Sequence, residues 1–113
     1  MVKRLLHAIS PQLFLLVLSL VFSLNLIDGL LTLIWVSTGI AEEANPIMAA
    51  WLEIGPLYFL SVKLTLVTGL LFFIHRFYSN LLARGLVLLV FLAYLMVLFI
   101  HLDILYWIVT HAP

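Results

Sequence analysis

Polar and charged side chains interrupt three long apolar stretches of this 113-residue chain. Asn25, Asp28 and Thr32 lie in the first stretch at i, i+3 and i+7 spacing, which places them on one face of a helix. Lys63 interrupts the second stretch, and His101 lies near the end of the third. An ionisable side chain in the hydrocarbon of a bilayer costs roughly 2.5–3.5 kcal/mol on insertion scales, so such residues indicate a functional site. Carboxylate, ammonium and imidazole groups could exchange protons, bind an ion or join helices.

These residues are expected to lie at similar depths. Counted at 1.5 Å per residue from the basic end of each stretch, Asp28, Lys63 and His101 lie about 20–25 Å along their helices, in the same half of the bilayer. The segment that follows the first stretch would roof a pocket there. We therefore predict a polar intramembrane cluster, whose role is either functional or that of a hydrogen-bond network holding helices together. Its members are Asn25, Asp28, Thr32, Glu43, Asn45, Lys63 and His101.

Two alternatives stay open for Lys63. It could pair with Asp28, which lowers the cost of burying either charge, or its long stem could carry the ammonium out to the interface. Gly29 lies in the same arc as Asp28 and would let a neighbouring helix approach closely.

Catalysis by familiar means finds little support in the sequence. The chain has no cysteine, and no serine lies in a G-x-S-x-G turn. His75 and His101 are expected near opposite membrane surfaces, so they would not hold one haem. Asp28, His101 and Glu43 are suitable zinc or iron ligands by type, but no H-E-x-x-H spacing is present. We predict no catalytic residues, no cofactor and no metal site. The sequence therefore favours a protein that is not an enzyme.

Composition sets the class of protein. The chain is 66% hydrophobic and 9% charged, with a mean hydropathy of +1.32. Soluble domains are usually about 45–50% apolar and about 25% charged. The formal net charge of zero leaves no basic surface for phosphates, so nucleic acid is an unexpected partner. The bilayer is the expected environment.

The elements that position the polar residues follow from length. A bilayer core of about 30 Å needs about 20 helical residues, and the segments 12–38, 56–77 and 84–109 qualify. Thr38-Gly39 ends the first, and Asn45-Pro46 starts a short segment, 46–54, that is too short to cross and is expected in the interface plane. The first thirty residues are expected to be a retained signal anchor. The predicted fold is an all-α membrane protein in which residues 1–113 form one domain.

Basic residues give an orientation. Lys3 and Arg4 precede the first span, and Arg76 and Arg84 flank the second-to-third turn, whereas the opposite side carries only acidic residues. The positive-inside rule then predicts a cytoplasmic N-terminus, with the C-terminus outside an inner membrane. An aromatic belt is expected at the outer boundary. It would consist of Trp35, Trp51, Tyr58, Tyr106 and Trp107.

The motif Asn25-x-x-Asp28-x-x-x-Thr32, followed by Glu43-Ala44-Asn45-Pro46 and Lys63, resembles a small prokaryotic integral-membrane family. That family is a domain of unknown function (5658). The resemblance runs from about Leu24 to Phe73, and includes the third span in hydrophobicity only. It implies a compact helical membrane domain with a shared polar cluster, and it implies no activity.

The predicted function is that of a non-enzymatic oligomerising or accessory subunit of a membrane complex. Three spans bury few helix faces, so the polar face of the first helix is expected to need a partner, either another copy of the chain or another membrane protein. The alternative is a small transporter or proton-conducting oligomer with Asp28 as the titrating group and Lys63 as its counter-ion. An intramembrane metal-dependent enzyme is the third hypothesis.

Overall fold

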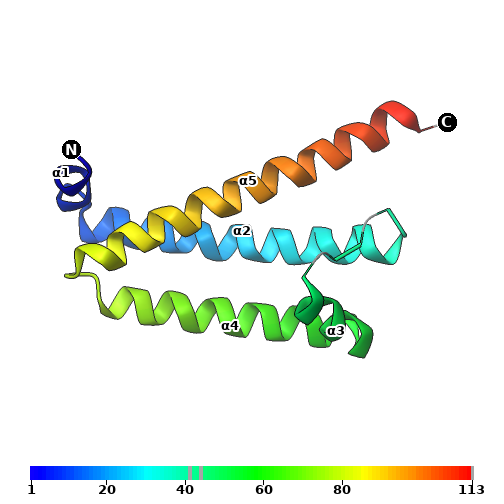
Figure 1. The fold of residues 1–113 in the computed structure, drawn as a ribbon, viewed down its shortest axis with the longest axis horizontal. Coiled ribbons are helices and arrows are strands. Elements are labelled where there is room, and N and C mark those ends of the chain that lie inside the picture. Colours follow the sequence, from blue (N-terminus) through cyan, green and yellow to red (C-terminus); the bar gives the residue numbers. More distant parts are fainter. Residues whose placement is uncertain (41, 44, 113) are drawn as a thin grey trace.

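The computed structural model describes residues 1–40, 42–43 and 45–112. Its helices follow one another as α1 (Val2–His7), α2 (Pro11–Ser37), α3 (Pro46–Ile54), α4 (Pro56–Arg76) and α5 (Leu81–His111). Figure 1 shows α2 and α4 running side by side in opposite directions, with α5 crossing over α2 and diverging from it towards the C-terminus. The short helix α3 packs against α4. We call the end that carries the α4–α5 turn the turn end, and the end that carries α3 the loop end.

Helix boundaries follow from capping chemistry. The Ser10 hydroxyl accepts a hydrogen bond from the Leu13 N–H at 3.1 Å, and Pro11 occupies the first turn, where its missing N–H costs nothing. At the other end of α2, Gly39 has φ +75°, a left-handed conformation that favours glycine. The Ile40 N–H then donates to the Trp35 carbonyl and the Gly39 N–H to the Val36 carbonyl, which is the Schellman arrangement. The predicted stop at Thr38-Gly39 therefore has a defined physical cause.

The predicted fold class is confirmed. Within the described residues, α2, α4 and α5 are long and apolar enough to cross a membrane, and α3 is the short helix between the first two. The expected ranges 12–38, 56–77 and 84–109 compare with Pro11–Ser37, Pro56–Arg76 and Leu81–His111. The helix α1 was not predicted, because six residues with two cations have neither the length nor the apolar periodicity that predicts a helix.

An apolar core fills the turn end. Phe14 and Val21 of α2 are 1% and 0% exposed, and Val87 of α5 is 0% exposed. Phe14 also meets the Tyr78 ring edge-on, with centroids 4.9 Å apart. The remaining core residues are Ile9, Val17, Leu18, Leu71, Ile74 and Ala83. Within the described residues, the buried polar side chains Asn25, Lys63 and His101 are not members of this core.

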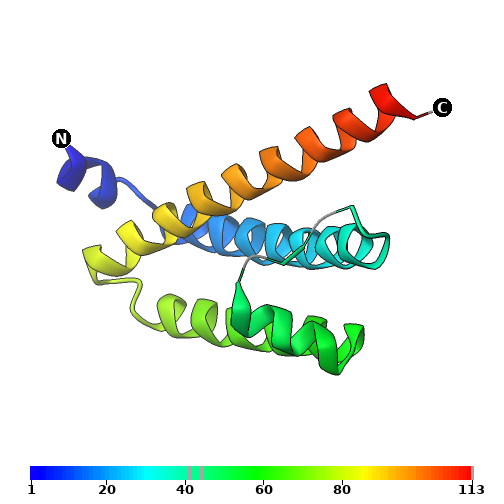
Figure 2. The ribbon, with the colours of Figure 1, turned by 45° about the vertical axis from the view of Figure 1, so that its right-hand side comes forward.

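The loop end of α5 is attached differently. The buried residues of α5 are Ala83, Val87 and His101, so none of the residues from 88 to 100 is fully buried. Figure 2 shows the helix leaving the α2–α4 pair over this length. His101 is therefore held against the bundle mainly by polar contacts, and the residues beyond it have no buried anchor among the described positions.

Candidate functional site

Asp28 lies at the centre of a polar cluster between the three long helices. One of its carboxylate oxygens accepts a hydrogen bond from the Lys63 ammonium of α4, and the other lies 2.7 Å from Nε2 of His101 on α5. Lys63 is 5% exposed and the Asp28 side chain is 14% exposed. Of the two alternatives for Lys63, the structure has the pair with Asp28. The opposite charges compensate each other in an environment where either alone would be costly.

A hydrogen bond from Trp35 determines which tautomer a neutral His101 adopts. The indole Nε1–H of Trp35 lies 2.9 Å from Nδ1 of His101. An indole can only donate, so Nδ1 is the acceptor, and the proton of a neutral imidazole is then on Nε2. The Nε2–H group faces a carboxylate that can only accept. The result is a continuous chain of donors from Trp35 through His101 to Asp28, with Lys63 donating from the other side.

Trp35 has a contact that was not predicted from the sequence. It was assigned to an aromatic belt, but it is 7% exposed and its indole faces the helix interface. A signal for this role exists in the sequence, because Trp35 follows Asp28 by seven residues and Thr32 by three, on the same helical face. Tryptophan is common at membrane boundaries, and residue type alone therefore gave no sign of this inward contact.

A second polar contact lies one turn closer to the turn end. The Tyr94 hydroxyl of α5 donates to Oδ1 of Asn25 at 2.9 Å, and Asn25 is 0% exposed. Its Nδ2 has no partner among the described residues. Tyr94 was not among the predicted members of the cluster, although it precedes His101 by seven residues and so shares its face of the helix.

Close approach of α2 and α4 makes the Asp28–Lys63 contact feasible. A Cβ at Gly29 would lie 2.9 Å from Cδ1 of Leu60 and 3.7 Å from Cδ of Lys63. Any larger side chain at position 29 would therefore meet α4 beside the ion pair. Gly29 therefore lets a neighbouring helix approach α2 closely, as predicted from its position beside Asp28.

A cavity of about 480 Å³ extends from the Asp28 cluster to the connection between α2 and α3. Among its lining residues are six of the predicted cluster: Asp28, Thr32, Glu43, Asn45, Lys63 and His101. Asn25 lies outside this lining. Trp35, Tyr94 and Glu42 also line the cavity. Its mouth is acidic because Glu42 and Glu43 both lie there. Within the described residues, no three His, Asp or Glu side chains are arranged to hold a metal ion.

Asn45 also has a structural task at this mouth. Its Oδ1 accepts from the Ile47 N–H at 2.9 Å and caps α3, while its own N–H donates to Oε1 of Glu43 at 3.2 Å. The predicted cap at Asn45-Pro46 is present in the structure. Its amide oxygen is therefore already engaged, and Asn45 contributes to the cavity mainly by shaping its rim.

The polar face of the first helix is covered by the chain itself. It was expected to need a partner, but α4 and α5 supply Lys63, His101 and Tyr94 to it. A different polar surface faces outward instead. On α4, Ser61, Thr65, Thr68 and His75 are all exposed.

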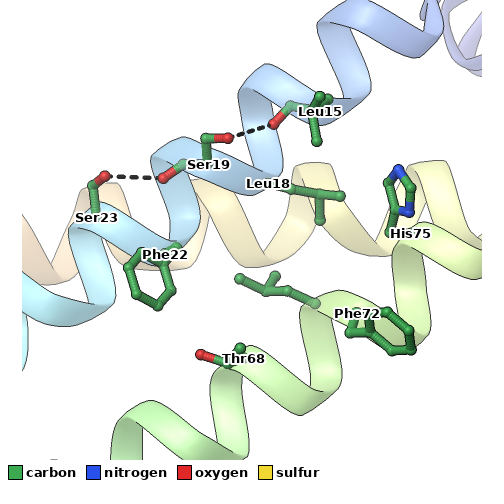
Figure 3. A pocket seen from close by; sticks show the side chains of 9 residues that line it. Leu15, Leu18, Ser19, Phe22, Ser23, Thr68, Phe72 and His75 are labelled. Atoms are coloured by element: carbon green, nitrogen blue, oxygen red, sulfur yellow. Dashed lines mark hydrogen bonds between the residues drawn. The ribbon is translucent and has the colours of Figure 1, made fainter.

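Part of that outward surface is a groove between α2 and α4, with a volume of about 420 Å³ (Figure 3). Ser19 and Ser23 line its α2 side, and their hydroxyls donate to the carbonyls of Leu15 and Ser19 at 2.9 and 3.0 Å. Thr68 and His75 line the α4 side, and neither bonds to another residue drawn in this groove (Figure 3). The groove contains no charged residue among those that line it.

Three membrane-length helices around a buried ion pair define a multi-pass helical membrane protein. A family model described as Domain of unknown function (DUF5658) matches residues 19–110, and the chain belongs to that family, as its motifs predicted. No curated protein and no solved structure matches the chain.

Proposed function

We propose that this protein is a non-enzymatic oligomerising or accessory subunit of a membrane complex, and that α4 carries the contact surface. The observation that supports this most directly is the outward polar face of a membrane-spanning helix, Ser61, Thr65, Thr68 and His75. Lipid offers no hydrogen-bond partner for such groups, whereas a neighbouring helix does. Gly69 lies on the same side, four residues after Thr65, and a Cβ built there would meet nothing within 4 Å. A second backbone could therefore approach closely.

Within this proposal the Asp28 cluster has a structural role that also keeps one cavity open. None of the residues that line this cavity belongs to the buried apolar core at the turn end, and the lining reaches Glu42 and Glu43 at the loop end. A cavity near one end of the bundle suits a subunit that binds or senses at one membrane face. It does not suit a single chain that conducts protons across the bilayer.

The testing experiment is gentle native purification of the full chain, with the mass and the components of the complex read by mass spectrometry. We expect a defined homo-oligomer or a stoichiometric membrane partner. Recovery of the chain only as a monomer, in several mild detergents and in nanodiscs, would contradict the proposal.

The second candidate is a transporter or proton-conducting oligomer, and the Asp28–Lys63 pair at the base of the cavity favours it. Its pathway through the turn end would have to form between copies, because the core of one copy is apolar. If this candidate is correct, proteoliposomes containing the wild-type oligomer carry flux, and Asp28→Asn abolishes the flux while assembly persists. Flux retained by the variant would exclude Asp28 as the titrating group.

The orientation that accompanies this proposal has the N-terminus in the cytoplasm of a prokaryotic cell and the C-terminus outside. Lys3, Arg4, Arg76 and Arg84 all belong to segments at the turn end (Figure 1), and this supports the positive-inside argument. The helix α3 would then lie in the outer interface plane.

A further inference from the structure

The turn end of the molecule concentrates positive charge without any acidic neighbour. Lys3 and Arg4 lie on α1, Arg76 ends α4, and Arg84 lies in the first turns of α5. No Asp or Glu occurs in the sequence from 1 to 27 or from 64 to 102. The cations of this end therefore have no anionic side chain to neutralise them within their own segments.

Arg84 is occupied in holding α1 in place. Its Nη1 donates to the Leu6 carbonyl at 3.2 Å, and its Nε donates to the Tyr78 carbonyl at 2.9 Å. The guanidinium also lies 4.2 Å from the centroid of the Tyr78 ring, and the Tyr78 hydroxyl donates to the Ile9 carbonyl at 2.6 Å. The α4–α5 turn thus binds the backbone at both ends of the α1–α2 connection. These contacts fix α1 against the base of α5 (Figure 1).

The outward side of α1 combines apolar and basic groups. Val2 and Leu5 are 68% and 60% exposed, and Lys3 and Arg4 are exposed beside them. Because α1 precedes the membrane-length helix α2 by only a few residues, a bilayer around α2 would have its headgroups at the level of α1. At that level, apolar side chains can enter the acyl boundary while cations remain among the phosphates.

We propose that α1 is a lipid-contact surface that binds the phosphate groups of anionic phospholipids through Lys3 and Arg4. The Tyr78–Arg84 contacts are the positioning element, because they hold the surface at a fixed angle to the bundle. The inference rests on charge complementarity and on the contacts of α1, and it is independent of what the Asp28 cluster or the α4 face does. Each Lys or Arg close to an anionic membrane surface contributes a preference of roughly fivefold.

The test uses the full chain in nanodiscs of phosphatidylcholine with or without phosphatidylglycerol. Native mass spectrometry counts the lipids that stay bound, and thermal melting measures the stabilisation by the anionic lipid. We expect the wild type to retain phosphatidylglycerol selectively, and Lys3→Gln/Arg4→Gln to lower that preference roughly 25-fold. Both side chains are exposed, so the variant should fold as the wild type does.

A charge-matched control separates the local surface from the net charge. Adding Glu42→Gln and Glu53→Gln, both exposed at the loop end, restores the net charge but leaves α1 without its cations. The proposal requires this four-fold variant to behave like Lys3→Gln/Arg4→Gln. Recovery of lipid selectivity in it, or equal retention of phosphatidylglycerol by the wild type and the double variant, would overturn the assignment of α1.

Discussion

The hydrogen bonds of His101 define what a side chain at that position must do. It accepts from Trp35 at one ring nitrogen and donates to Asp28 from the other, at 2.9 and 2.7 Å. A glutamine amide also offers one acceptor and one donor, whereas leucine offers neither. Beyond Val87, His101 is the one buried residue among the described positions of α5, so these two bonds and the Tyr94–Asn25 bond attach this part of the helix to the bundle.

We expect His101→Leu to lower the free energy of unfolding by about 1–3 kcal/mol, because it leaves the buried Trp35 donor without a partner. His101→Gln should cost less than about 1 kcal/mol, since it can make both bonds. Thermal or chemical unfolding in detergent micelles measures the difference. Equal losses in the two variants would show that these two hydrogen bonds do not account for the stability that His101 contributes.

The Asp28–Lys63 pair yields a prediction about mutual dependence. Asp28→Asn leaves a buried ammonium without its counter-charge, a change that costs about 3–5 kcal/mol when one partner of a buried pair is removed. Lys63→Met strands the carboxylate and should cost a similar amount. The double variant Asp28→Asn/Lys63→Met removes both charges and should recover much of the loss, which a double-mutant cycle measures. Additive losses would show that the two side chains do not depend on each other.

Among the helices, α4 has one face towards α2 and another towards lipid or a partner. Gly29 of α2 packs against the first of these faces, because a Cβ at position 29 would lie 2.9 Å from Leu60 of α4. Gly69 lies on the second face, where nothing is within 4 Å of the added carbon. The two glycines therefore provide a matched pair of substitutions, one for the internal interface and one for the external surface.

Gly69→Leu should leave the stability of the single chain unchanged or raise it by up to about 1 kcal/mol, because leucine is the better helix former. Gly29→Leu should lower it by about 1–3 kcal/mol through overpacking against α4. If α4 mediates assembly, Gly69→Leu also disrupts the oligomer or releases the partner, as measured by native mass spectrometry. Intact assembly in that variant would move the contact surface away from α4.

The polar face of α2 could be predicted from the sequence more completely than the residues of α4 and α5 that contact it. Asn25, Asp28 and Thr32 repeat along one helix, so their common direction follows from helical geometry alone. Lys63 and His101 could be placed at the right depth by counting residues, but whether Lys63 turned to Asp28 or to the interface depends on how α4 rotates against α2. Trp35 and Tyr94 were missed because aromatic side chains serve both as boundary anchors and as interior donors, and only the packing decides between them.

Over the whole molecule, polarity is divided between the two ends. The turn end is closed by apolar packing and surrounded by cations, whereas the loop end holds the cavity and the acidic residues Glu42 and Glu43. This division agrees with a single orientation in the membrane. It also places the Asp28 cavity near one end of the bundle.

The absence of cysteine in the sequence makes the orientation directly measurable. Single substitutions Ser79→Cys at the turn end and Glu42→Cys at the loop end, both at exposed positions, can be labelled in intact cells with a membrane-impermeant maleimide. We expect label on Glu42→Cys before lysis and on Ser79→Cys only after lysis. The opposite pattern would reverse the proposed topology.

The free length of α5 beyond His101 has a mechanical consequence. From His101 to His111 the helix continues for ten residues, about 15 Å at 1.5 Å per residue, without a buried anchor. Because Ala83 and Val87 anchor the other end of α5, loss of the His101 bonds would let this length swing away from the bundle. The distance of position 111 from the bundle should therefore depend on the hydrogen bonds of His101. A spin label or fluorophore at position 111 would measure that distance.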